Sequence, residues 1–180
     1  INDSDTGELL KLSEGRLYDT TVAEIRRGEP GNPGQVAGLI RYRDNLICGQ
    51  IQENTEAGIF GEGTERLSEK LAEERLEIGY KQEIVEGEAL VRTGISGEIR
   101  DYRIEIEEVR CGESDVNKGM ILRVTDAELL GMTGGIIQGM SGSPILQNGK
   151  LVGAVTHVFV NDPTKGYGIF AEEMLAHVNR

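Results

Sequence analysis

The chain has 180 residues and a mass of 19.7 kDa, enough for one domain of ordinary size. It carries 19 Lys and Arg against 31 Asp and Glu, and the net charge of -12 argues against a nucleic-acid groove or an anionic membrane surface as the main partner. No apolar run approaches the roughly 18 residues that cross a bilayer, and residues 1–10 do not have the pattern of a signal peptide. Glycine accounts for 25 residues, about 14% and roughly twice the usual share, so we expect many tight turns.

Turn signals divide the chain into short segments that read mostly as strands. The predicted strands are 16–27, 35–42, 45–51, 78–85, 87–95, 98–110 and 119–125, followed by two in 145–160. Residues 28–34, GEPGNPG, predict a turn, and Asn148-Gly149 predicts a tight hairpin. In 98–110 the apolar residues alternate with charged ones at approximately period two: Ile99, Tyr102, Ile104, Ile106 and Val109. The charged side of this strand is interpreted as a solvated sheet face.

Helices have a minor part in this pattern. Residues 63–75 favour a short helix and a charged loop equally, with Thr64 available as a cap. A turn of helix is predicted at Asp126–Leu130 and a closing helix at 171–178. About ten short strands with one or two short helices indicate an all-β fold, either a barrel or a sandwich.

Neither the cysteines nor the acidic residues form a recognisable metal site. Cys48 and Cys111 lie far apart with no His at ligand spacing, which disfavours structural zinc; a disulfide between them and two unpaired buried thiols are equal alternatives. Residues 3–7, DSDTG, are similar to the start of a calcium loop. Glu8 stands where that loop needs glycine, so an Asx-type turn is the better interpretation. We expect no metal and no cofactor.

The segment 131–144, GMTGGIIQGMSGSP, contains the main candidates for catalytic residues in the chain. It is not a phosphate-binding loop, because Met140 stands where the loop needs Lys. It does have the form of a nucleophile turn, in which small residues let backbone N–H groups surround a developing oxyanion. This reading makes Ser141 the nucleophile and the N–H groups of Gly139 and Ser141 the oxyanion hole. The alternative, a glycine turn with incidental serines, remains open on spacing alone.

The turn resembles the G-x-S-G-[GS]-P motif of chymotrypsin-like proteases, and the wider segment 133–175 resembles the peptidase domain of the stage IV sporulation protein B (SpoIVB) family. The stretches NKGMILRVTD at 117–126, DSDTG at 3–7 and YKQEI at 80–84 match that family too. The resemblance implies a chymotrypsin-like double β-barrel, with residues 1–180 as one serine peptidase domain of two barrel lobes. It also implies that Asp126 and Ser141 are the catalytic acid and nucleophile.

The chain departs from the family pattern at the catalytic base. In the family it is the His of a Gly-His-x-Ile motif directly before D-x-D-T-G, and this chain begins at that Ile, as Ile1. The chain therefore reads as a domain truncated just after its base, with activity near zero on its own. The two histidines present do not fit the role: His177 is predicted on the surface of the last helix. His157 is hypothesised to line the substrate pocket, with a core position as the alternative.

The resemblance also implies a biological setting. Members of the family are serine endopeptidases that cleave themselves and a membrane-bound regulator in the sigma-K pathway of sporulation. The full-length protein is expected to be exported into the space between the forespore and mother cell membranes, held by an N-terminal segment, with a PDZ module ahead of the peptidase domain. Two other classes stay open: a non-catalytic β-rich binding module and a pseudo-peptidase that has kept the fold.

Overall fold

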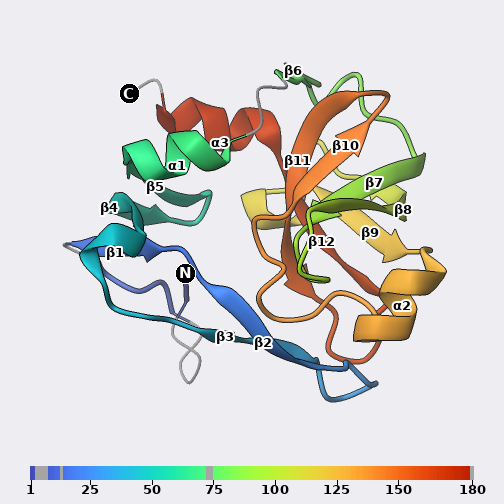
Figure 1. Ribbon diagram of the computed structural model, residues 1–180. Coiled ribbons are helices and arrows are strands. Elements are labelled where there is room, and N and C mark those ends of the chain that lie inside the picture. The colour runs from blue at the N-terminus through green and yellow to red at the C-terminus, as the bar shows by residue number, and fades with distance from the viewer. Residues whose placement is uncertain (3–7, 13, 72–74, 179–180) are drawn as a thin grey trace.

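The structure is a computed structural model that describes residues 1–2, 8–12, 14–71 and 75–178. Strands dominate it, and half of those in the described residues belong to a closed barrel in the second half of the chain (Figure 1). The Asx-type turn predicted at residues 3–7 lies outside the described residues. In the described part, no helix is long and apolar enough to cross a membrane.

Six antiparallel strands form the barrel. They are β7 (Gly87–Thr93), β8 (Arg100–Val109), β9 (Met120–Val124), β10 (Pro144–Gln147), β11 (Lys150–Val158) and β12 (Lys165–Phe170). Their order is β10-β7-β8-β9-β12-β11, and pairing between β10 and β11 closes the ring. The two-residue strand β6 (Glu77–Ile78) adds to β11 in parallel. Closure leaves each of the six strands with a partner on both sides.

Alternating apolar residues fill this barrel. On β8, Tyr102, Ile104 and Ile106 are at most 2% exposed, while the charged residues between them face outward. Full burial of such a side chain stabilises the fold by about 1.5–3 kcal/mol. The predicted alternation is therefore confirmed along the strand. It is wrong at Ile99, which precedes the strand and is 74% exposed.

The first half of the chain forms two smaller sheets. Strands β1 (Gly15–Tyr18), β4 (Ile47–Thr55) and β5 (Gly58–Gly63) make a three-stranded sheet, and β2 (Thr21–Arg26) pairs with β3 (Gln35–Leu39) in a ribbon below it (Figure 1). Among the described residues these strands do not close into a second ring. The chymotrypsin-like β fold is thus present with one closed barrel, and the division into two barrel lobes stays a prediction.

The strand predicted at 16–27 is instead two strands in different sheets. The break falls at Asp19, whose carboxylate accepts a hydrogen bond from the Arg66 guanidinium at 2.7 Å and lies 2.8 Å from the Lys70 ammonium. Both cations belong to α1 (Glu65–Lys70). The ion pairs hold Asp19 against this helix, so the chain leaves the first sheet before β2 begins.

Helices are few and short, as predicted. Besides α1, they are α2 (Ala127–Thr133), α3 (Ala171–Val178) and the 3-10 turns η1 (Asp44–Leu46) and η2 (Val116–Lys118). Helix α3 follows β12 and joins the two halves, because its Met174 packs with Phe60 of β5 around buried Ala154 and Ile169 of the barrel. The strand predicted at 78–85 is wrong beyond Ile78, where the chain turns.

Both cysteines are free thiols, so the disulfide alternative is excluded in this structure. The alternative of two buried thiols holds at Cys48 but is wrong at Cys111, which is exposed. The hairpin at Asn148-Gly149 is confirmed. Its two central residues have φ of 52° and 77°, the left-handed values that a tight hairpin turn requires.

Candidate active site

The serine turn follows α2 and leads into β10. Gly139 and Gly142 have φ of 101° and 88°, which side-chain-bearing residues rarely adopt. A Cβ at Gly139 would lie only 3.0 Å from the Cβ of Val36, on β3 of the first half. Glycine is therefore required at position 139 for two reasons, its backbone angle and the close approach of β3.

Hydrogen bonds fix the turn to β11. The Gly142 N–H donates to the Val155 carbonyl at 2.8 Å, and the Val155 N–H donates to the Ser143 carbonyl at 3.0 Å. The Ser143 N–H in turn donates to the Met140 carbonyl at 3.0 Å. Met140 is buried at 1% exposure, whereas Ser141 is exposed. The turn thus holds a serine hydroxyl at the surface over an apolar anchor.

The two predicted oxyanion donors have no internal acceptor. Throughout the described part of the chain, no carbonyl or side chain accepts a hydrogen bond from the N–H of Gly139 or of Ser141, although the Met140 N–H between them donates to the Ile137 carbonyl at 3.1 Å. Two fixed, unpaired N–H groups beside an exposed hydroxyl can bind an oxyanion. Their role stays a prediction, and the geometry leaves both donors free for it.

The Ser141 hydroxyl donates to the Thr156 carbonyl at 2.6 Å. Thr156 lies on β11 directly before His157, so this strand borders the candidate nucleophile. Within the described residues, no imidazole bonds to the hydroxyl. The serine is therefore held on a backbone acceptor, and among the described residues no base is hydrogen-bonded to it.

Asp126 is the N-cap of α2. Its Oδ1 accepts from the N–H groups of Glu128 and Leu129 at 2.9 and 3.2 Å, and its Oδ2 accepts from the Arg103 N–H at 3.3 Å. Burial alone would raise the pKa of this carboxyl, but the three backbone N–H groups outweigh it and hold the pKa below its usual value. The carboxylate is therefore ionised at neutral pH and oriented by the backbone.

The barrel register places Asp126 and Ser141 at the same end of the barrel. Val124, at the end of β9, pairs with the first half of β8, and that part of β8 pairs through β7 with the start of β10. No hydrogen bond or ion pair joins Asp126 to Ser141 in the described structure. The predicted catalytic pair thus shares an end of the barrel without direct contact.

The histidines differ in their surroundings. His157 is exposed on β11; desolvation lowers its pKa and the Asp115 carboxylate opposes that shift. The positive charges of Lys118 and of the amino terminus lower the pKa further. His177 is half-buried rather than at the bare surface, because its ring stacks on Phe60 at 5.3 Å.

The amino terminus is held by Asn54 on β4. The Ile1 ammonium donates to Asn54 Oδ1 at 2.5 Å, and Asn54 Nδ2 donates to the carbonyls of Ile1 and Leu10 at 2.7 and 2.9 Å. These bonds fix the start of the chain against β4.

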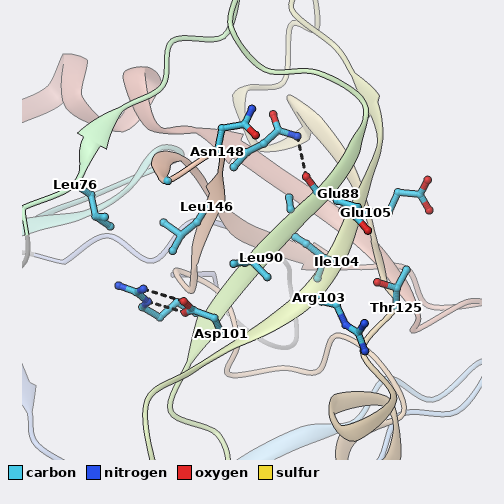
Figure 2. Close-up of a pocket in the computed structure, with 14 residues that line it drawn as sticks. Leu76, Glu88, Leu90, Asp101, Arg103, Ile104, Glu105, Thr125, Leu146 and Asn148 are labelled. Atoms are coloured by element: carbon cyan, nitrogen blue, oxygen red, sulfur yellow. Dashed lines mark hydrogen bonds and ion pairs between the residues drawn. The ribbon is translucent and has the colours of Figure 1, made fainter.

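A cavity lies elsewhere, on the outer face of β7, β8 and β10 (Figure 2). It has a volume of about 780 Å³ and is lined by apolar Leu76, Leu90 and Leu146 beside the ion-paired Arg92 and Asp101. Neither Ser141 nor Asp126 lines it. The charged outer side of β8, predicted as a solvated face, forms part of this open cavity. In the described part of the chain, no three His, Cys, Asp or Glu side chains are grouped to hold a metal.

Sequence reasoning missed three residues of this site. Thr156 and Asn54 act through long-range hydrogen bonds that leave no local signal. Met140 did leave a local signal in the sequence, because it is a large apolar residue between two glycine-rich stretches that carry the candidate oxyanion donors.

The closed six-stranded antiparallel barrel, the helix after its last strand and the serine turn at the barrel end define a chymotrypsin-like β fold, known from serine peptidases. A family model described as SpoIVB peptidase S55 matches residues 1–175. The chain belongs to the SpoIVB peptidase family, and this membership indicates a serine peptidase hydrolase. A search of curated proteins returned no match to the chain.

Proposed function

We propose that the chain is a serine endopeptidase domain in which Ser141 is the nucleophile. One observation carries the proposal: the Ser141 hydroxyl is exposed on a hydrogen-bonded turn whose Gly139 and Ser141 N–H groups have no internal acceptor within the described residues. An exposed hydroxyl beside two preorganised donors is the arrangement that acyl transfer needs. Membership in the SpoIVB peptidase family supports the same reading.

The proposed base is a histidine in the residues before Ile1, as in the Gly-His-x-Ile motif of the family. The resemblance of DSDTG at 3–7 to the segment that follows this motif in the family supports this. Asp126, ionised and oriented by backbone N–H groups, is proposed to orient the imidazole.

The chemistry follows the serine-histidine-aspartate scheme. The histidine takes the Ser141 proton as the oxygen attacks the peptide carbonyl, and the Gly139 and Ser141 amides bind the oxyanion. The histidine then gives this proton to the leaving amine, which leaves an acyl-serine that water hydrolyses. Loss of one oxyanion donor in comparable sites costs about 3–4 kcal/mol of transition-state stabilisation. Without the histidine, residues 1–180 alone are expected to have almost no activity.

The biological role is proposed from the family resemblance. The substrates would be the protein itself and a membrane-bound regulator in the sigma-K pathway of sporulation. The full-length protein would be exported to the space between the forespore and mother cell membranes, anchored at its N-terminus and preceded by a PDZ module. His157, exposed on the strand beside Ser141, is proposed to line the substrate pocket.

A second candidate is a pseudo-peptidase or β-rich binding module. Two contacts favour it: Ser141 donates to a backbone carbonyl rather than to a base, and both oxygens of Asp126 already accept from backbone N–H groups. In that case the glycine turn would only connect α2 to β10.

A serine-directed fluorophosphonate probe separates the two candidates. It is applied to a chain that extends upstream through the Gly-His pair, with Ser141→Ala as the control. The peptidase proposal expects labelling at Ser141 and none in the variant. An unlabelled wild-type chain that is folded would support the non-catalytic module. A residue other than His at the upstream position would favour a pseudo-peptidase.

A further inference from the structure

We infer that Met140 is a positioning residue: its buried side chain anchors the turn and so fixes the two oxyanion donors on either side of it. This inference rests on the proposed function of the Ser141 turn. Met140 itself touches neither substrate nor nucleophile; it acts through the backbone.

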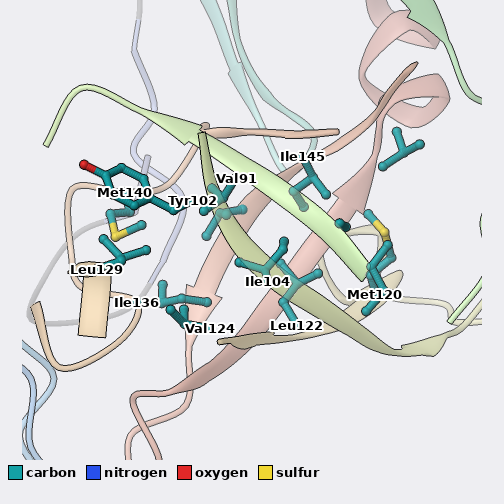
Figure 3. Close-up of a cluster of buried hydrophobic side chains, with 14 of the residues drawn as sticks. Val91, Tyr102, Ile104, Met120, Leu122, Val124, Leu129, Ile136, Met140 and Ile145 are labelled. Atoms are coloured by element: carbon teal, nitrogen blue, oxygen red, sulfur yellow. The ribbon is translucent and has the colours of Figure 1, made fainter. Parts of the chain in front are cut away.

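The anchor lies inside the barrel. Met140 is 1% exposed and belongs to the main core cluster, and Figure 3 draws it beside Tyr102 and Leu129 at one end of that cluster. Its neighbours Gly139 and Ser141 are exposed. Met140 is therefore buried between two exposed neighbours, and it lies between the two candidate oxyanion donors.

The backbone N–H and the backbone carbonyl of Met140 are both hydrogen-bonded as well. Its N–H donates to the Ile137 carbonyl at 3.1 Å, and its carbonyl accepts from the Ser143 N–H at 3.0 Å. With side chain and backbone both fixed, the peptide planes on either side of Met140 have little freedom to rotate. These planes carry or adjoin the N–H groups of Gly139 and Ser141.

The anchor is apolar, and its surroundings in the sequence are uncharged. Residues 131–144 contain no ionisable side chain. Burial of the Met140 thioether therefore acts together with the backbone hydrogen bonds and the glycine angles to hold the turn, and no charge within the turn contributes. We expect the turn to be formed before any substrate binds.

Met120 provides a matched control. It is the same residue type, is 0% exposed and belongs to the same cluster, but Figure 3 places it at the opposite end. Met140→Ala and Met120→Ala thus remove the same atoms from one core. Any effect confined to Met140→Ala reports on the turn and not on lost core packing.

The first measurement uses the 180-residue chain and amide hydrogen exchange by NMR. It follows the Gly142 and Ser143 amides relative to Leu122 in the barrel. Met140→Ala should speed exchange at both turn amides at least tenfold more than Met120→Ala does, and Met140→Leu should restore protection. Equal exchange in the two alanine variants would overturn the inference. If either alanine variant does not fold, Met140→Val against Met120→Val gives the same comparison.

The second measurement uses the upstream-extended chain described above. Met140→Ala should lower kcat about 100-fold with KM within threefold, because a displaced oxyanion donor costs that order of rate. Met120→Ala should leave kcat within threefold. Unchanged kcat in Met140→Ala, with an active wild type, overturns the inference and leaves the proposed function standing. A wild type that neither cleaves nor labels refutes the proposed function, while the exchange experiment still decides whether Met140 anchors the turn.

Discussion

Substitution of Asp126 separates the two roles that its carboxylate can have. As the N-cap of α2 it satisfies two helix N–H groups and the Arg103 N–H. As the proposed catalytic acid it must carry a negative charge. Asn is nearly as good an N-cap as Asp but has no charge, whereas Ala can neither cap the helix nor carry a charge. The pair Asp126→Asn and Asp126→Ala therefore distinguishes the cap from the charge.

The structure sets the expected loss of stability. Asp126→Ala removes the cap, typically worth about 1 kcal/mol. The N–H of Leu129, a residue with 0% exposure, is one of the groups that this cap satisfies, so the loss lies near the upper end of the range for caps, at about 2 kcal/mol. A loss of about 2 kcal/mol lowers Tm by roughly 4–8 °C in a chain of this size. Asp126→Asn loses about 1 kcal/mol, mainly its interaction with the helix dipole.

The pH dependence has a definite sign. The folded-state pKa of Asp126 is lowered, so its charge stabilises the fold above the unfolded-state value of about 3.9, and this contribution is lost as pH falls through the folded-state pKa. The difference in unfolding free energy between wild type and Asp126→Asn should be largest above about pH 5 and shrink toward pH 3. Urea unfolding across this range measures it.

Activity decides the catalytic role. In the upstream-extended chain, Asp126→Asn should lower kcat about 10⁴-fold while the protein stays folded. Asp101→Asn, which removes another carboxylate near the same barrel end, one paired with Arg92 at 2.7 Å, should leave kcat within twofold. Equal stability of the Asn and Ala variants would refute the capping argument, and full activity of Asp126→Asn would refute the catalytic one.

Two other substitutions test neighbouring residues. His157→Ala in the active chain should change side-chain preference at the cleavage site, measured with a peptide library; unchanged preference at unchanged rate would exclude it from the pocket. Tyr102→Phe should leave the free energy of unfolding unchanged or raise it by up to about 1 kcal/mol, because the buried hydroxyl has no hydrogen-bond partner in the described structure. A loss above about 1 kcal/mol in urea unfolding would mean that the hydroxyl is bonded.

Local patterns in the sequence predicted the elements that depend on neighbouring residues. The Asn148-Gly149 hairpin needs only two left-handed residues, and the alternation on β8 needs only one buried face. Barrel closure could not be predicted in this way, because β10 pairs with β7 across more than fifty residues. The break at Asp19 likewise depends on two cations of α1 that lie far along the chain.

The residues of the candidate site also differ in whether local sequence patterns could predict them. The Ser141 turn could be predicted, since its glycines and serine are contiguous. The cap at Asp126 also had a local signal, an aspartate directly before a helical segment, but we interpreted this residue through its catalytic role alone. The Thr156 acceptor and the inward direction of Met140 depend on how β11 and the barrel core approach the turn, which no local pattern records.

The most direct test of the central claim is to locate covalent modification at Ser141. A chain extended upstream through the Gly-His pair is treated with a fluorophosphonate probe, digested and analysed by mass spectrometry. The account predicts a single modified peptide that contains Ser141, with labelling abolished when the upstream histidine is replaced by alanine. A folded, extended chain that remains unlabelled, or that is labelled equally well without the histidine, would contradict it.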